Sequence, residues 1–155
     1  MEVFGNPQLL SLNLTMLYHC TGSIAVTFNS ALQAFSIPFF SSNPLNLNIS
    51  FNPVLTEVDF PRMLYFSGAI TVSRNPKLAV LHFDAFEFSG ENSVLTIDSN
   101  ASLNTVSFLG LECGFISNII ISNNPNLAFL RVTSACQDLT VITLVNNPNV
   151  QLVLV

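Results

Sequence analysis

The chain has 155 residues, of which 50% are hydrophobic and 8% are charged, and its net charge is −5. This length predicts a single domain. Nucleic-acid binding is not expected, because contacts to the phosphate backbone need clustered positive charge and the chain has only four basic residues. No uncharged apolar run approaches the roughly 18 residues that a membrane-spanning helix needs, so no membrane span is expected in this segment.

Asparagine recurs along the chain at steps of 23, 23, 23, 25, 24 and 23 residues. Each of these asparagines is followed three residues later by an aliphatic side chain. A period of this length is typical of a solenoid, in which successive repeats stack as coils. The repeated asparagines are Asn6, Asn29, Asn52, Asn75, Asn100, Asn124 and Asn147.

Each repeat carries two short alternating patterns, with apolar residues five and three positions before the asparagine and six and eight positions after it. This alternation is that of a strand with one buried face, and the β-branched and aromatic residues that fill it favour strands. We therefore predict two strands per coil with a corner at the asparagine, and parallel pairing of like strands about 4.8 Å apart. In chain order, the expected inward-facing segments are 1–3, 12–14, 24–26, 35–37, 47–49, 58–60, 70–72, 81–83, 95–97, 106–108, 119–121, 130–132, 142–144 and 153–155.

The asparagine has a physical role at this corner. A buried corner leaves backbone groups without partners in a strand ladder, and those groups must be satisfied. The carboxamide offers two donors and two acceptors, enough to bond its own corner and a neighbouring coil. We therefore expect the stacked asparagines to form a continuous ladder. Proline follows in five of the seven repeats, where it fixes φ and keeps the asparagine extended.

The stretches ITVSRNPKLAVLHF (residues 70–83) and IIISNNPNLAFLRV (residues 119–132) resemble the repeats of the receptor L domain. That family provides the ligand-binding domain of insulin and epidermal growth factor receptors and also occurs in fungal cell-wall glycoproteins. An ordinary leucine-rich repeat has its next leucine two residues after the asparagine, whereas the gap here is three, which favours the L-domain type. The resemblance covers nearly the whole chain and implies a right-handed solenoid with a ligand-binding role.

The fold prediction is therefore a mainly β protein, a right-handed parallel β-solenoid that is L-domain-like and related to leucine-rich repeats, with about seven coils. Residues 1–155 form one solenoid domain. The final residues, VQLVLV, are apolar and carry no polar cap, so we expect an open core and strand edge there. The chain is thus expected to be a fragment of a longer repeat domain, or to be covered by end-to-end or edge association with another chain.

Cysteines and sequons predict the compartment. Cys113 and Cys136 are one coil apart, so stacking is expected to bring them within disulfide range; the alternative is two buried free thiols. Sequons begin at Asn13, Asn48 and Asn100, of which the first two are expected to face outward and carry glycan, while the third belongs to the ladder. The opening MEVFGNPQLL fits the repeat and lacks a basic start, so it is not expected to be a signal peptide. We predict an extracellular or cell-surface location.

The outward residues of the second strand predict a binding face. They grade from an acidic end to an apolar and basic end, and aromatic residues with arginine often anchor a partner. The candidate ligand-binding residues are Glu57, Asp59, His82, Phe129 and Arg131. The expected partner is a protein or a glycan. The alternative is a solvated sheet face that binds nothing.

Other chemistry has little support in the sequence. Asp59, His82 and Ser107 should follow one another on adjacent coils, but an exposed strand ladder offers neither a pocket nor an oxyanion hole, so no catalytic residue is predicted. No metal site and no cofactor are predicted. Three nearby acidic residues fit no known calcium loop; they are Asp84, Glu87 and Glu91.

The predicted function is a non-enzymatic extracellular recognition or scaffold module. One alternative is a structural cell-surface or cell-wall protein whose faces bind nothing specific. A further alternative is an ice-binding protein, because the outward residues of the first strands form a strip rich in threonine and serine. That strip is interrupted by Asn48, Asp98, Ile120 and Val145.

Overall fold

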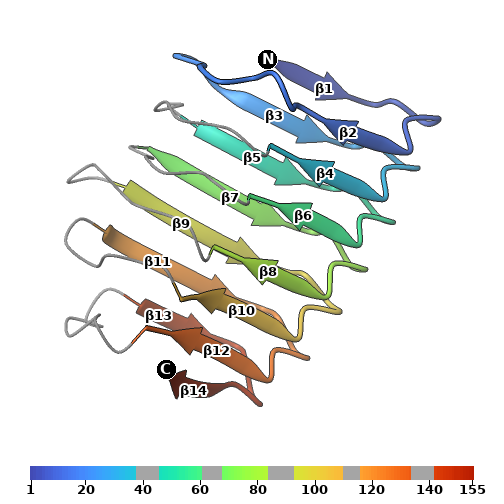
Figure 1. The fold of residues 1–155 in the computed structure, drawn as a ribbon. Coiled ribbons are helices and arrows are strands. Elements are labelled where there is room, and N and C mark those ends of the chain that lie inside the picture. The colour runs from blue at the N-terminus through green and yellow to red at the C-terminus, as the bar shows by residue number, and fades with distance from the viewer. Residues whose placement is uncertain (38–45, 61–67, 84–92, 110–115, 134–141) are drawn as a thin grey trace.

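The computed structural model describes residues 1–37, 46–60, 68–83, 93–109, 116–133 and 142–155. Within these ranges the chain has fourteen strands and no helix, and so no helix that could cross a membrane. Figure 1 shows the strands stacked as successive coils, with the N-terminus at one end of the stack and the C-terminus at the other. The predicted parallel β-solenoid is confirmed.

The first strands of all coils form one sheet of seven strands, in which every neighbouring pair is parallel. The register matches like positions of the repeat, since Ile49 pairs with Val72 and Val72 pairs with Ile97. The strands are β1 (Glu2–Phe4), β3 (Ile24–Thr27), β5 (Asn46–Ser50), β7 (Ala69–Ser73), β9 (Ser93–Asp98), β11 (Ile116–Ser122) and β13 (Ile142–Val145).

The second strands form two sheets rather than one. β2 (Ser11–Asn13), β4 (Ala34–Ser36) and β6 (Glu57–Asp59) make a three-stranded sheet. A four-stranded sheet contains β8 (Val80–His82), β10 (Thr105–Phe108), β12 (Phe129–Val132) and β14 (Gln151–Leu154). β6 and β8 follow each other in the stack (Figure 1) but are not joined in one sheet. The sequence does not predict this break, because the apolar columns run through it unchanged.

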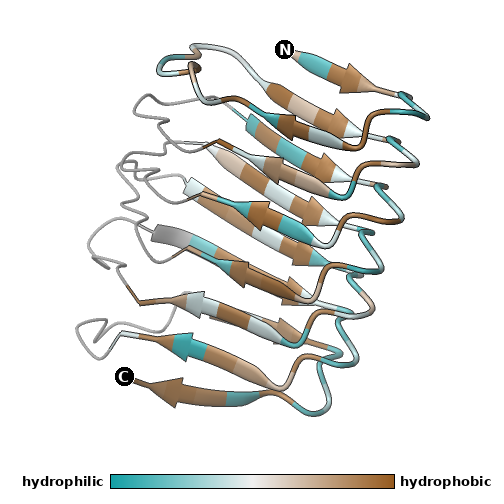
Figure 2. Cartoon of the chain, turned by 45° about the vertical axis from the view of Figure 1, so that its right-hand side comes forward, coloured by the Kyte–Doolittle hydropathy of each residue, from teal (hydrophilic) through white to brown (hydrophobic). Residues whose placement is uncertain are grey.

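The core lies between the strand layers and consists of the predicted inward columns of the inner coils, whereas Met1, Leu144 and Val155 at the two ends are exposed. Figure 2 shows the resulting alternation of hydrophobic and hydrophilic residues along the strands. A column of phenylalanines fills its middle. The ring centroids of Phe60 and Phe83 lie 5.7 Å apart, those of Phe83 and Phe108 lie 5.3 Å apart, and Phe35 meets Phe60 edge-on at 6.4 Å. Burial of one such side chain stabilises the fold by about 1.5–3 kcal/mol.

The asparagine ladder is present, and it joins each coil to both neighbours. Oδ1 of Asn75 accepts hydrogen bonds from the backbone N–H of Asn52 at 3.1 Å and from its Nδ2 at 3.3 Å. Nδ2 of Asn75 donates to the carbonyl oxygen of Ile49 at 3.0 Å and to Oδ1 of Asn100 at 3.4 Å. The ladder therefore satisfies the backbone groups that the buried corners expose.

The end coils differ from those inside the stack. Five ladder asparagines are fully buried, namely Asn29, Asn52, Asn75, Asn100 and Asn124. Asn6 is exposed and Asn147 is half-buried. About seven coils were expected; seven first strands are present, and five of the coils have a buried corner.

The residue before each ladder asparagine has a left-handed backbone, with φ between 53° and 66°. In every coil but the last, its N–H donates to a carbonyl of the next coil, as from Phe28 to Ser50 at 3.2 Å. The left-handed conformation costs a residue other than glycine roughly 1–2 kcal/mol. Since most of these residues are not glycine, the repeated corner geometry must impose this conformation on them. The residues are Gly5, Phe28, Phe51, Arg74, Ser99, Asn123 and Asn146.

The last strand does not follow the predicted register. β14 pairs Leu152 with Leu130 and Val153 with Arg131, whereas the apolar columns place Val153 opposite Leu130. The prediction was wrong because QLVLV is apolar at nearly every position, and alternation then cannot fix the register. A shift of one residue moves Val153 to the outward side, beside Arg131.

Candidate functional site

All five predicted ligand-binding residues lie on the outward side of the second strands and are exposed. Glu57 and Asp59 belong to β6, His82 belongs to β8, and Phe129 and Arg131 belong to β12. Because β6 and β8 belong to different sheets, the acidic pair lies on one sheet and the other three residues lie on the next. The predicted face therefore spans two sheets, whose neighbouring strands β6 and β8 lie in contact without being paired.

The strand register arranges the outward residues of the four-stranded sheet in two rows. His82, Ser107 and Arg131 are successive partners in one row, and Thr105 pairs with Phe129 in the other. Between the rows lies a shallow depression lined by Thr105, Phe129, Arg131 and Val153. The shifted register of β14 contributes Val153, which is why sequence analysis did not include it.

The depression combines three kinds of contact. Phe129 is 43% exposed and offers an apolar ring, Thr105 offers a hydroxyl group, and Arg131 offers a guanidinium group. Arg131 has no ion-pair partner among the residues that the structure describes. An arginine fork pairs well with a planar carboxylate, so this site can hold an anionic group beside an apolar one.

The structure corrects one expectation about this face. Ser107 was expected to lie exposed in a row with Asp59 and His82, but it is 1% exposed. Its small side chain is flanked in its row by the longer His82 and Arg131. Asp59 lies across the sheet break from His82.

The outward side of the seven-stranded sheet is less open than predicted. Thr71 and Thr96 are paired neighbours there, and both are half-buried. Ser50, expected in the same strip, is only 3% exposed. The carboxamide oxygen of Asn48 is buried and has no hydrogen-bond partner. This side therefore presents few freely exposed hydroxyl groups.

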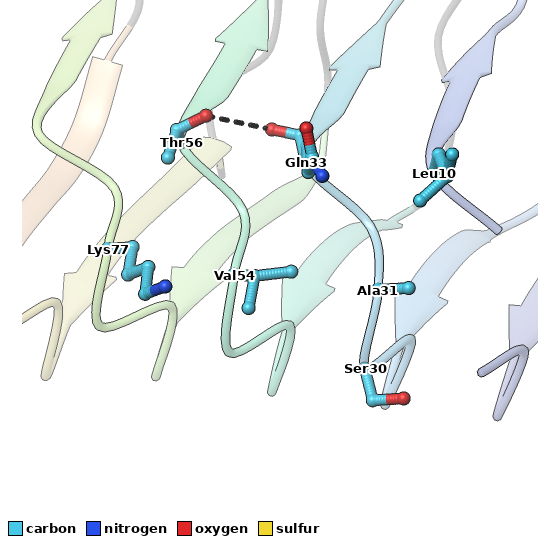
Figure 3. Close-up of a pocket in the computed structure, with 7 residues that line it drawn as sticks. All are labelled: Leu10, Ser30, Ala31, Gln33, Val54, Thr56 and Lys77. Carbon is cyan, nitrogen blue, oxygen red and sulfur yellow. Dashed lines mark hydrogen bonds between the residues drawn. The ribbon is translucent and has the colours of Figure 1, made fainter. Parts of the chain in front are cut away.

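A second concave region lies along the corner of the first four coils (Figure 3), and sequence analysis did not identify it. Its walls are side chains one, two and four residues after the ladder asparagines, where the chain turns from the corner into the second strand. Thr56 donates from its hydroxyl to the backbone carbonyl of Gln33 at 3.2 Å. The lining residues are Leu10, Ser30, Ala31, Gln33, Val54, Thr56 and Lys77. Polar, apolar and cationic groups are mixed here without a concentrated charge.

The corners also carry an aromatic column outside the core. The rings of Phe28 and Phe51 stack with centroids 4.5 Å apart, Phe4 packs against Phe28 at 5.3 Å, and the guanidinium of Arg74 lies 4.8 Å from the centre of Phe51. The faces of the two central rings are therefore occupied by neighbours. Gly5, Asn123 and Asn146 are residue types that tolerate positive φ, but the other four residues at this position hide that signal.

Asp98, at the end of β9, has the one clearly shifted pKa among the described residues. Burial acts to raise its pKa, but hydrogen bonds from Ser122, Asn123 and Ser99 and the charge of Arg74 hold the pKa below its ordinary value. The hydroxyl of Ser122 donates at 2.6 Å, and Nδ2 of Asn123 and the hydroxyl of Ser99 donate at 2.8 Å. Asp98 therefore stabilises the junction of two coils.

The remaining predicted residues divide between described and undescribed parts of the chain. Cys113 and Cys136 lie outside the described residues, as do the three nearby acidic residues at 84–91. Cys20 packs against the core, with its thiol 3.5 Å from the carbonyl oxygen of Gly22. Asn13 is exposed on β2, and Asn48 is half-buried. The described residues contain no group of three potential metal ligands.

Comparison with known proteins adds no assignment. No protein-family model, no curated protein and no solved structure matches this chain. The function must therefore be argued from the solenoid and its faces.

Proposed function

We propose that this chain is a non-enzymatic recognition module that binds a protein or glycan partner through the outward side of its second strands. The observation that carries the proposal is the depression between β10, β12 and β14, where Phe129 and Arg131 stand beside Thr105 and Val153. Aromatic residues and arginine are enriched among residues that dominate binding energy. Their position on paired strands of a sheet favours a preformed site over one ordered on binding.

The receptor L-domain likeness supports the same proposal. The repeat unit around Asn75 and Asn124 is the basis of that likeness, and a solenoid with this repeat presents long regular faces to partners. We further propose an extracellular or cell-surface location, which is consistent with the exposed sequon asparagine Asn13.

Particular observations disfavour the two alternative functions, a structural wall protein and an ice-binding protein. A structural wall protein with inert faces does not require an exposed Phe129 beside an arginine that has no ion-pair partner in the described part of the chain. An ice-binding face requires regular exposed threonines, whereas Thr71 and Thr96 are half-buried.

A capture experiment with two matched double variants tests the proposal. The wild-type chain is immobilised and exposed to a glycan array and to a library of secreted and cell-surface proteins. Phe129→Ser with Arg131→Gln removes the ring and the charge of the depression. Leu10→Ser with Lys77→Gln removes an exposed apolar side chain and a cation from the other concave region. We expect capture by wild type and by the second variant, and loss of capture by the first.

Three outcomes would contradict the proposal. Absence of any captured ligand would favour an inert structural protein. Loss of capture by the Leu10 and Lys77 variant alone would place the binding site in the corner region. Equal capture by both double variants would exclude both concave regions from the binding site.

A further inference from the structure

The outward side of the second strands is divided by charge as well as by strand pairing. On the three-stranded sheet, the outward residues of β6 are Glu57 and Asp59, and both are exposed. On the four-stranded sheet, the outward residues of the described strands include no acidic side chain, and Arg131 is their permanently charged group. The outward residues of that sheet are Val80, His82, Thr105, Ser107, Phe129, Arg131, Gln151 and Val153.

The sheet break lies at the boundary between these charges. β6 ends the acidic sheet and β8 begins the other one. Three strand steps separate β6 from β12, which corresponds to roughly 14 Å at the usual spacing of 4.7–4.9 Å per strand. The face is thus an electric dipole along the solenoid axis, with its apolar depression at the positive end.

We propose that the partner of this face is a polypeptide with a matching polarity, an inference that rests on the proposed function. An apolar side chain occupies the depression beside Phe129, and an acidic side chain next to it pairs with Arg131. A basic side chain further along pairs with Glu57 and Asp59. Polypeptide side chains supply an apolar group, an anion and a cation within this distance, and complementary charges orient such a partner.

The spacing limits the arrangement of the partner's charges. An extended segment advances about 3.4 Å per residue, so its acidic and basic residues should be about four positions apart. The apolar anchor adjoins the acidic residue, not the basic one, whichever way the segment runs. This adjacency distinguishes the proposed polarity from simple attraction between charged molecules.

Selection of random displayed peptides on the chain tests the proposal. One selection uses wild type, and a second uses a variant with the charges exchanged by Glu57→Arg, Asp59→Arg and Arg131→Glu. Wild type should select peptides with an apolar residue beside an acidic one and a basic residue further along. These peptides should bind the exchanged variant at least about tenfold more weakly. The exchanged variant should select peptides in which the apolar residue adjoins a basic one.

Controls separate failure of this inference from failure of the proposed function. Lys77→Glu reverses one charge outside this face and should leave binding of the selected peptides unchanged. Peptides without the predicted pattern, or equally strong binding to the exchanged variant, would overturn the proposed polarity. If a glycan array binds wild type but not Phe129→Ser with Arg131→Gln, while no peptide is selected, the recognition function stands and the polypeptide partner is excluded. If neither peptides nor glycans bind, both proposals fail.

Discussion

The rings of Phe28 and Phe51 stack with centroids 4.5 Å apart and an interplanar angle of 8°, although both residues have a left-handed backbone with φ of 58°. A bulky side chain at positive φ is a conformational outlier. The stack offsets part of the strain, because aromatic pairs contribute about 0.5–1.5 kcal/mol beyond the area they bury. The corner geometry thus tolerates residues that a left-handed turn normally excludes.

This corner predicts an unusual order of stability at position 28. Phe28→Gly relieves the backbone strain, whereas Phe28→Val places a β-branched residue at positive φ. We expect the valine variant to be less stable by about 1–2 kcal/mol, because that is the penalty of the left-handed conformation. The adjacent Thr27, which lies in a strand, is the control position. Thr27→Gly should be less stable than Thr27→Val, because glycine weakens the interior of a strand. Urea unfolding measures the stability of the glycine and valine variants at both positions. The same order of stability at positions 27 and 28 would contradict a left-handed backbone at Phe28.

The buried ladder predicts a large effect of removing one carboxamide. Asn75→Ala leaves the backbone N–H of Asn52 and the carbonyl of Ile49 without their partners. Each unsatisfied buried group costs about 1–3 kcal/mol, so the free energy of unfolding should fall by at least that amount. Asn104→Ala, at an exposed site, is the control and should change stability by less than about 0.5 kcal/mol. If Asn75→Ala lowered the free energy of unfolding no more than the control does, the ladder would be ruled out.

The lowered pKa of Asp98 predicts how stability depends on pH. A carboxyl group whose folded pKa is below its unfolded value of 3.8 stabilises the fold above that value. The unfolded state binds the proton first, so the contribution is lost as pH falls through the folded pKa. Unfolding of wild type and Asp98→Asn should be measured from neutral to strongly acidic pH. The advantage of wild type should shrink below pH 3.8; an advantage that grows there would have the wrong sign.

Solvent access predicts which sequon is used if the chain is secreted. Asn13 is exposed on β2, whereas the side chain of Asn100 is buried in the ladder and donates to the carbonyl of Val72 at 3.0 Å. Secretion from a eukaryotic cell should therefore yield folded protein with glycan at Asn13 and none at Asn100. Site-resolved peptide mass spectrometry, with Thr15→Ala as the control, measures this. Glycan at Asn100 in folded protein, or an unmodified Asn13, would refute the prediction.

The repeat was readable from the sequence because each coil repeats the same burial demands. The alternating columns around Asn29, Asn52 and Asn75 predicted parallel strands, the core and the ladder. The left-handed residue before each asparagine was not predicted, because Phe28 and Phe51 are poor residues for that conformation. Neighbouring coils impose it through backbone hydrogen bonds that no local pattern reveals.

The candidate site was only partly predictable for similar reasons. Phe129 and Arg131 stood out because aromatic and cationic residues are unusual on an outward face. Val153 was missed because the apolar end of the chain fits two registers equally well. The break between β6 and β8 was missed because Val58 and Leu81 continue the inward column across it. Burial of Ser107, which lies between His82 and Arg131 in its row, does not follow from a column of residue types.

We propose that the depression at Phe129 and Arg131 binds the partner. The most direct test is calorimetric titration of the tightest captured ligand into wild type and the two double variants. Phe129→Ser with Arg131→Gln should weaken binding by at least about a hundredfold, because anchor residues often contribute 2 kcal/mol or more each. Leu10→Ser with Lys77→Gln should stay within about twofold of wild type, as expected of surface changes outside an interface. Unchanged binding by the first variant, or an equal loss by the second, would contradict the claim.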